Sequence, residues 1–162
     1  MQEFAGREAE FKAMLNARGL QLAALYSDDN GYDPGSEAET IERNLEIARF
    51  LQALGADILV YDPGRPRPDP ALPEHFDVVA HTVNEIARAS HDMGVTTAIH
   101  PHWQALIQER DDVTRIFDMV DTKYAKLTVD PSHMVKVGYD RRSAKPTARS
   151  SPTCTSRTSP RN

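Results

Sequence analysis

Short apolar segments alternate with longer amphipathic ones along most of the chain. The apolar segments predict four β-strands: LQLAALYS (20–27), ADILVY (56–61), TTAIHPH (96–102) and AKLTVD (125–130). Residues 20–27 barely alternate between apolar and polar positions, which predicts a strand that is buried on both faces.

Amphipathic segments separate these strands. Ser36 and Glu39 form a capping-box pattern before a helix that Gly55 ends. A second helix is expected from about residue 74 to 93, and a third over residues 111–120. The inner face of the second helix is expected to carry Phe76, Val79, Val83, Ile86 and Ala87.

The order of strands and helices indicates an α/β protein. Strands that alternate with helices through short loops favour a parallel sheet with right-handed crossovers. Neither G-x-G-x-x-G nor G-x-x-x-x-G-K-[S/T] occurs, which argues against a dinucleotide or P-loop site. A doubly wound sheet without such a site is the alternative to a (β/α) barrel.

Polar residues gather at the ends of the predicted strands. Tyr26, Asp62, His100, His102 and Asp130 lie at the carboxyl ends or just beyond them. The carboxyl ends of parallel strands meet on one side of the sheet, where such proteins build their active sites. We therefore expect these side chains to converge.

His100 and His102 are two residues apart at the end of the third predicted strand. Side chains of an extended segment repeat every second residue, so both imidazoles share a face. Such a pair can ligate one cation or bind one polar substrate. The alternative is that both are loop histidines that cap the following helix.

Asp130 ends the fourth predicted strand, and His133 follows after a turn imposed by Pro131. A carboxylate in this place can hold a divalent cation, and the imidazole can hydrogen-bond a substrate hydroxyl or carbonyl group. The alternative is that Asp130 caps the next turn and that His133 is merely exposed.

Charge is unevenly distributed along the chain. The net charge is −5, but residues 141–162 carry six basic and no acidic side chains, which leaves −11 on the first 140 residues. An acidic body is a poor match for a phosphate backbone, so nucleic acid is not the expected partner. The sequence contains no run of 18 apolar residues, so it does not indicate a membrane span. The single cysteine, Cys154, suits the reducing cytoplasm.

Three motifs resemble the xylose isomerase-like TIM barrel group of sugar isomerases, epimerases and dehydratases. Members tend to carry a strand ending in E-N-H or H-x-H, a later strand ending in D-x-G-H, and then G-x-D. The corresponding residues here are His100-Pro101-His102, Asp130-Pro131-Ser132-His133 and Gly138-Tyr139-Asp140. The resemblance covers roughly residues 10–140. Within the group, H-P-H followed six residues later by Gln108 looks most like the inosose dehydratases of inositol catabolism.

The resemblance implies a partial (β/α) TIM barrel of about four parallel strands, because a complete barrel needs about 250 residues. It also implies one divalent metal ion, Mn²⁺, Co²⁺, Mg²⁺ or Zn²⁺. In such a site the metal polarises a carbonyl or hydroxyl group and stabilises an enediolate while a side chain moves the proton. The expected partner is a small sugar, sugar phosphate or cyclitol, and a homo-oligomer is an open option.

The resemblance also assigns roles to individual residues. Asp130 and His100 are the expected metal ligands, although many relatives have Glu where His100 stands. His102 and His133 are the expected catalytic residues and contact the substrate. Trp103 and Gln108 are expected to help bind it.

Two other functions remain open. Residues 130–140 are also similar to AP endonucleases of the endonuclease IV type, but those enzymes need three zinc ions and a basic DNA-facing surface. A non-catalytic module is the other alternative, with structural histidines and a basic tail that binds nucleic acid.

Residues 141–162 contain no Val, Leu, Ile, Met, Phe, Tyr or Trp, which predicts a disordered basic tail after a domain formed by residues 1–140. Reading the codons of this stretch one nucleotide earlier allows an apolar strand ending in H-x-H-x-K-D, as is common in the group. We therefore expect a frameshift near codon 140; a native flexible tail is the alternative. The chain also opens with a helix that would follow a first barrel strand. A half-barrel that is inactive by itself is thus expected.

Overall fold

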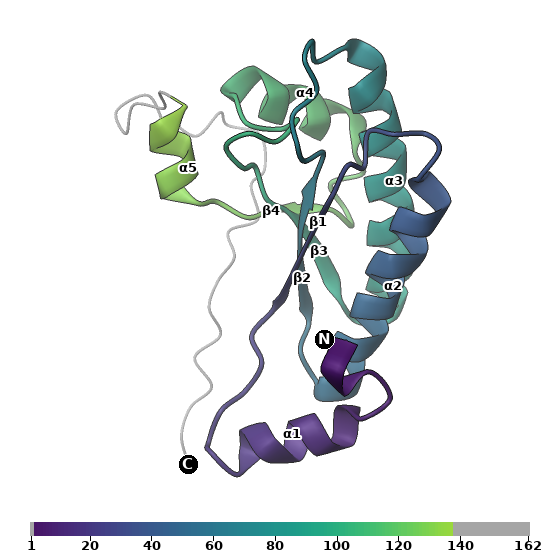
Figure 1. Cartoon of the computed structure of the whole chain (residues 1–162), viewed down its shortest axis with the longest axis vertical. Coiled ribbons are helices and arrows are strands. Elements are labelled where there is room, and N and C mark those ends of the chain that lie inside the picture. The colour runs from purple at the N-terminus through teal and green to yellow at the C-terminus, as the bar shows by residue number, and fades with distance from the viewer. Residues whose placement is uncertain (1, 138–162) are drawn as a thin grey trace.

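The computed structural model describes residues 2–137, which form a parallel sheet with helices packed against it (Figure 1). The Gly138-Tyr139-Asp140 motif and the expected basic tail lie outside the described residues. In chain order the elements are η1 (Gln2–Phe4), α1 (Glu8–Asn16), β1 (Leu25–Asp29), α2 (Glu37–Leu54), β2 (Ile58–Pro63), α3 (Pro73–Asp92), β3 (Thr96–Ile99), α4 (Arg110–Met119), β4 (Lys126–Leu127) and α5 (Pro131–Lys136).

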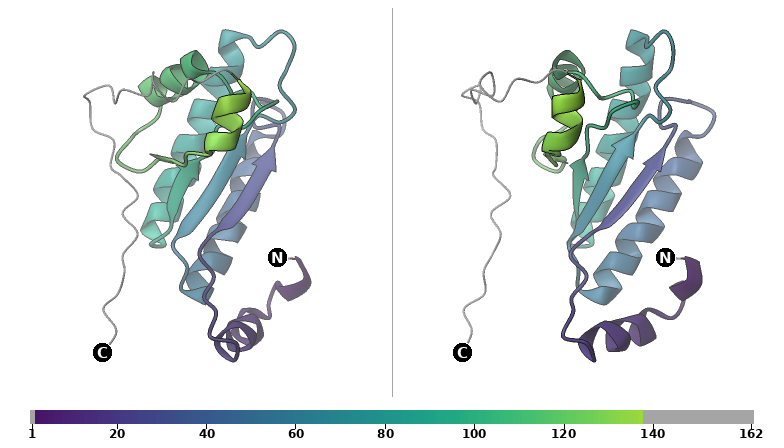
Figure 2. Two further views of the ribbon diagram at one scale, coloured as in Figure 1. Left: turned by 90° about the vertical axis from the view of Figure 1, so that its left-hand side faces the viewer. Right: turned by 60° about the vertical axis from the view of Figure 1, so that its left-hand side comes forward.

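The strands lie in the order β1-β2-β3-β4, and every neighbouring pair is parallel. The long helices α2 and α3 lie side by side on one face of the sheet, and within residues 2–137 no long helix covers the other face (Figure 2). A doubly wound sheet would carry helices on both faces. The predicted partial (β/α) barrel is therefore confirmed. We call the face opposite α2 and α3 the open face.

The hydrophobic core fills the space between the sheet and these two helices. Leu59 and Tyr61 of β2 and Ile99 of β3 are fully buried and belong to the core. Because side chains alternate along a strand, Val60 and Asp62 point to the open face. All the residues expected on the inner face of α3 are buried: Phe76, Val79, Val83, Ile86 and Ala87.

Helix boundaries follow the local signals. Gly55 and Gly94 end α2 and α3 with φ angles of 79° and 77°, in the left-handed region that glycine adopts without strain. Ser36 directly precedes α2 as predicted, but it does not cap the helix with its side chain. Its hydroxyl instead donates to the carbonyl oxygen of Asp33 at 3.1 Å.

The first strand differs from its prediction. It comprises Leu25–Asp29 instead of residues 20–27, so Tyr26 lies near its start. The predicted burial on both faces is also wrong, since Leu20 and Tyr26 are 53% and 47% exposed. The physical reason is that β1 pairs only with β2 among residues 2–137, and its outer side chains lie on the open face.

The third and fourth strands are shorter than predicted. Strand β3 ends at Ile99, so His100 and His102 follow it, and β4 has only two residues. The Thr128 N–H still donates to the Ile99 carbonyl oxygen at 2.8 Å, which continues the β3–β4 pairing by one residue. Among residues 2–137, no helix has both the length and the apolar character needed to cross a bilayer.

Candidate active site

The ends of β2 and β3 bring the predicted polar residues to one rim of the open face. Asp62 lies near the end of β2, and His100 directly follows β3. Tyr26 lies between them, because its hydroxyl donates to Asp62 Oδ2 at 2.8 Å and its ring lies edge-on to His100, with centroids 5.8 Å apart. The parallel register of the strands produces this arrangement.

Three imidazoles meet at this rim. His100, His102 and His133, the histidine cluster, each offer one ring nitrogen, and these nitrogens lie within 4.8 Å of one another. The ring centroids of His102 and His133 are 3.8 Å apart, and that of His100 is 5.7 Å and 5.6 Å from them. His133 reaches the cluster because α5 turns to the side of the sheet opposite α2 and α3 (Figure 1).

Hydrogen bonds distinguish the ring nitrogens of the cluster. His102 Nδ1 lies 2.5 Å from the carbonyl oxygen of Trp103. His100 Nδ1 and His133 Nδ1 are buried and have no hydrogen-bond partner within residues 2–137. Burial and then the neighbouring imidazoles lower the pKa of His100, and burial likewise lowers the pKa of His102. Both rings are thus favoured in the neutral form that can bind a cation.

Asp130 supports α5 and faces His133. Its Oδ1 accepts hydrogen bonds from the Ser132 N–H at 2.8 Å and from the Ser132 hydroxyl at 2.5 Å, so it caps the helix. These bonds hold the pKa of Asp130 below its usual value. Its Oδ2 lies 3.6 Å from His133 Nε2. The carboxylate therefore lies beside the histidine cluster, but Asp130 is not one of the residues whose possible ligand atoms converge.

Asp62 is fully buried beside the cluster. Arg65 Nη1 lies 3.8 Å from its Oδ2, whereas its Oδ1 has no partner in the described part of the chain. Burial raises the pKa of Asp62 to about 7, although the Tyr26 hydrogen bond and the Arg65 charge both oppose this shift. Asp62 is therefore a carboxyl group that can change its protonation state near neutral pH.

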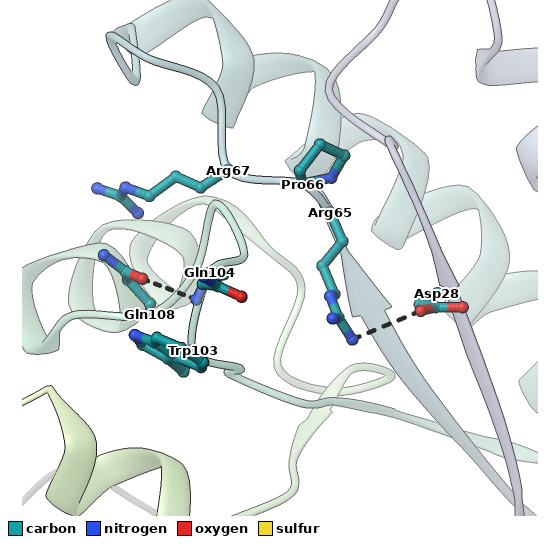
Figure 3. Close-up of a pocket in the computed structure, with 7 residues that line it drawn as sticks. All are labelled: Asp28, Arg65, Pro66, Arg67, Trp103, Gln104 and Gln108. Atoms are coloured by element: carbon teal, nitrogen blue, oxygen red, sulfur yellow. Dashed lines mark hydrogen bonds and ion pairs between the residues drawn. The ribbon is translucent and has the colours of Figure 1, made fainter.

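A pocket of about 720 Å³ opens next to these residues (Figure 3). It is lined by Asp28, Arg65, Pro66, Arg67, Trp103, Gln104 and Gln108. Trp103 and Gln108, which the sequence predicted as substrate-binding residues, thus share one pocket. The Lys136 ammonium group lies 3.9 Å from the centre of the Trp103 ring, so α5 also contacts the pocket wall.

Arg65 and Asp28 were missed by the sequence analysis. The Arg65 guanidinium lies 3.6 Å from Asp28 Oδ2 (Figure 3). It also lies 3.8 Å from Asp62 Oδ2 and so links the pocket to Asp62. The Pro-rich loop after residue 62 contained the available signal, because it carries two arginines directly beyond a strand end. Its conformation could not be predicted from its composition.

The residues present fit a divalent cation. Neutral imidazoles suit Zn²⁺, Co²⁺ and similar ions, and the two buried Nδ1 atoms without partners provide unused lone pairs. A cation would satisfy these atoms, which otherwise lose their hydration without compensation.

Comparison with known proteins identifies the fold family. The family model described as xylose isomerase-like TIM barrel matches residues 2–153. No curated protein matches the chain in sequence.

Solved structures share the fold at low sequence identity. The probable 3-DHS dehydratase AsbF from Bacillus anthracis aligns with a TM-score of 0.73 and 15% identity over 86% of this chain and 52% of its own. D-allulose 3-epimerase from Methylomonas sp., in complex with D-allulose, gives 0.68 and 20% over 82% and 50%. The IOLI protein, with a zinc atom bound, gives 0.68 and 16% over 83% and 50%.

The chain spans about half the length of the solved proteins it matches. The family match covers most of the sequence, and the described elements reproduce the alternating strands and helices of the barrel. The chain belongs to the xylose isomerase-like TIM barrel family.

Proposed function

We propose that this chain supplies half of the active site of a divalent-cation-dependent sugar or cyclitol isomerase, epimerase or dehydratase. The reaction class is proton movement next to a carbonyl group, through an enediolate. The observation that carries this proposal is the histidine cluster at the carboxyl ends of the strands, beside Asp62 and the pocket. The similar folds of an epimerase, a dehydratase and a zinc-containing protein support it.

The cation, when bound at the histidine cluster, would polarise a substrate carbonyl group and stabilise the negative charge that develops on its oxygen. The proposal keeps the roles that the sequence resemblance implies for the side chains. His100 and Asp130 would hold the cation, and His102 and His133 would contact the substrate. Burial lowers the pKa of His102 and favours its neutral form, which can accept and return a proton at the carbon next to the carbonyl group.

The neighbouring pocket suits a polyhydroxylated ligand. The ring of Trp103 is 38% exposed and offers an apolar face to the C–H bonds of a sugar or cyclitol ring. Gln108 and the Arg65–Asp28 pair offer both donors and acceptors for hydroxyl groups. In this proposal the substrate lies between Trp103 and the histidine cluster.

The proposal gives the protein a small-molecule partner in the cytoplasm. The −11 charge on the first 140 residues disfavours a nucleic-acid substrate. Catalysis would need further strands, because four strands supply only part of the rim of an eight-stranded barrel. We include in the proposal that residues 141–162 are read out of frame.

Deuterium exchange tests this proposal. The 162-residue chain and a product read one nucleotide earlier from codon 140 are incubated with Co²⁺ and inosose or D-allulose in D₂O, and deuterium next to the carbonyl group is followed by NMR. We expect exchange with the frame-restored product and none with the 162-residue chain. Exchange by the short chain, an early stop codon in the shifted frame, or no exchange by a folded frame-restored product would each contradict the proposal.

A further inference from the structure

We infer that Arg67 is a positioning residue, which together with Asp112 holds the loop between β2 and α3 against the loop between β3 and α4. We call the Arg67–Asp112 pair the loop latch. Its consequence for catalysis rests on the proposed function, because the latch fixes Trp103 and His102 beside the space assigned to the substrate. The latch itself can be tested without turnover, so its failure would leave the proposed function intact.

Two loops supply nearly the whole lining of the pocket. The loop after β2 and the loop after β3 each contribute three of its seven lining residues: Arg65, Pro66 and Arg67 from the first, and Trp103, Gln104 and Gln108 from the second (Figure 3). The shape of the pocket therefore depends on how these two loops are held against each other.

Backbone hydrogen bonds join the two loops at two points. The Arg67 N–H donates to the Gln104 carbonyl oxygen at 2.7 Å, and the Leu106 N–H donates to the Gly64 carbonyl oxygen at 2.8 Å. Gln104 has a φ of 67°, in the left-handed region that residues other than glycine rarely adopt. Such a backbone angle persists where the surrounding contacts maintain it. The second loop therefore depends on its contacts with the first.

The Arg67 side chain satisfies buried backbone groups of the second loop. Ala105 and Leu106 are fully buried, so their carbonyl oxygens need hydrogen-bond donors from the protein. Arg67 Nη1 donates to the Leu106 carbonyl oxygen at 2.5 Å and to that of Ala105 at 3.2 Å. Without the guanidinium group both oxygens would lose this donor, and the loop would have to move outward to hydrate them.

Asp112 completes the latch from the start of α4. Its Oδ2 lies 2.8 Å from Arg67 Nη1, and its side chain is only 13% exposed. The same oxygen accepts the Glu109 N–H at 3.0 Å and the Gln108 N–H at 3.3 Å, so it caps α4 as well. A charge-assisted hydrogen bond in such surroundings is stronger than an ion pair on the surface. Lysine lacks the planar set of donors that guanidinium offers and cannot reproduce all these bonds.

The same loop carries His102 and Trp103. The His102 N–H donates to the Ile107 carbonyl oxygen at 3.0 Å, and the His102 carbonyl oxygen accepts from the Ala105 N–H at 3.1 Å. The segment from His102 to Ile107 is thus closed on itself and moves as a unit. By holding this segment through its buried carbonyl groups, Arg67 fixes the positions of both the His102 and the Trp103 side chains relative to β2.

Fluorescence of Trp103, the single tryptophan, tests the inference in the folded 162-residue chain. We expect Arg67→Met to raise the acrylamide quenching constant of Trp103 by about twofold, because the released loop exposes the indole. Arg67→Lys should restore part of the difference, since it keeps the charge beside Asp112. Val83→Ala is the control. Val83 is fully buried in α3, so this change lowers global stability without altering the latch and should leave the quenching constant unchanged.

Amide hydrogen exchange measured by NMR separates a local effect from a global one. Arg67→Met should speed exchange of the Leu106 and His102 amides by about 10- to 100-fold relative to the His100 amide, which is bonded to the Tyr61 carbonyl oxygen within the sheet. Asp112→Asn keeps an oxygen that can cap α4 but removes the charge, so its effect should be in the same direction and smaller.

Arg49→Met is the matched ion-pair control. It breaks a pair of the same 2.8 Å length with Glu42, on the exposed surface of α2, and should leave the relative exchange rates unchanged. Unchanged quenching and unchanged relative exchange in folded Arg67→Met would overturn the inference. An equal acceleration at Leu106, His102 and His100 would also overturn it, since Arg67 would then stabilise the fold as a whole. If Arg67→Met does not fold, the same measurements on Arg67→Lys and Asp112→Asn decide.

Discussion

Asp62 is fully buried, and its Oδ1 has no hydrogen-bond partner among residues 2–137, which makes its ionised form costly. Burial raises its pKa from an ordinary value of 3.8 to about 7. Between these two pH values the native state holds a proton that the unfolded chain has released. The stabilising contribution of the protonated group is therefore complete below about pH 4 and is lost as the pH rises to about 7.

We predict that Asp62→Asn gains stability relative to wild type as the pH rises. Asn keeps the shape of the side chain and stays neutral, so it removes the cost of burying the charge. Between about pH 5.5 and 8.5 the difference in free energy of unfolding should move by about 2 kcal/mol in favour of the variant. Urea unfolding followed by circular dichroism at several pH values measures this difference. Because both proteins contain the same histidines, the pH-dependent contributions of those residues to stability cancel in it.

Asp28→Asn is the matched control for this experiment. Asp28 also lies near Arg65, at 3.6 Å, but its side chain is 49% exposed. Its effect on the free energy of unfolding should change little with pH, because an exposed carboxylate is solvated in both states. Parallel pH profiles for Asp62→Asn and wild type would show that Asp62 ionises normally in the folded protein.

Gly64 determines how the loop after β2 packs against the pocket. Its N–H donates to the Asp29 carbonyl oxygen at 2.8 Å, and its carbonyl oxygen accepts from the Leu106 N–H at 2.8 Å. Its φ is +94°, and a Cβ atom at this position would lie 2.6 Å from Leu106 Cβ. Glycine is thus required both for the backbone angle and for the close approach.

We predict that Gly64→Ala destabilises the protein by about 2–4 kcal/mol, because backbone strain adds to the clash with Leu106. Gly94→Ala is the control, since Gly94 has a φ of +77° but nothing within 4 Å of an added Cβ. That variant should lose only about 1 kcal/mol, from the strain alone. Chemical denaturation of both variants measures the difference. Equal losses would mean that the Leu106 loop moves aside at little cost.

Long helices were predictable from the sequence, whereas the outer strands were not. The apolar spacing of α3 repeats over about three turns, so its buried face was identified correctly from Phe76 to Ala87. In β1 the apolar run LQLAAL suggested a buried strand, yet Leu20 remains outside the sheet and Tyr26 is half exposed. Apolar composition alone does not reveal that a strand lies at an edge, where one side has no neighbour to bury it.

The side of the sheet on which the candidate residues gather was predictable, but their contacts with one another were not. Parallel strands bring their carboxyl ends together, so the convergence of Asp62 and His100 follows from topology. Tyr26 lies near the start of β1 and reaches Asp62 through its long side chain. The position of His133 depends on the direction in which α5 turns after Pro131. The role of Asp130 depends on its hydrogen bonds with Ser132. Both depend on tertiary contacts that residue spacing does not contain.

Within residues 2–137, β1 and β4 each have only one neighbouring strand in the sheet. Leu127 of β4 and Val129 just beyond it are 38% and 54% exposed. They lie two residues apart, which places them on the same face of the extended segment. Unpaired backbone groups beside exposed apolar side chains promote association through the edge of the sheet.

We predict that Val129→Lys raises the concentration at which the chain self-associates by on the order of tenfold, because a charge at the edge of β4 must be desolvated when another strand pairs there. Leu20→Lys is the control. Leu20 has a similar exposed fraction, 53%, but lies outside the paired segment of β1. Concentration-dependent light scattering of both variants measures the effect. If Leu20→Lys suppresses association as strongly, general surface hydrophobicity drives it and the β4 edge does not.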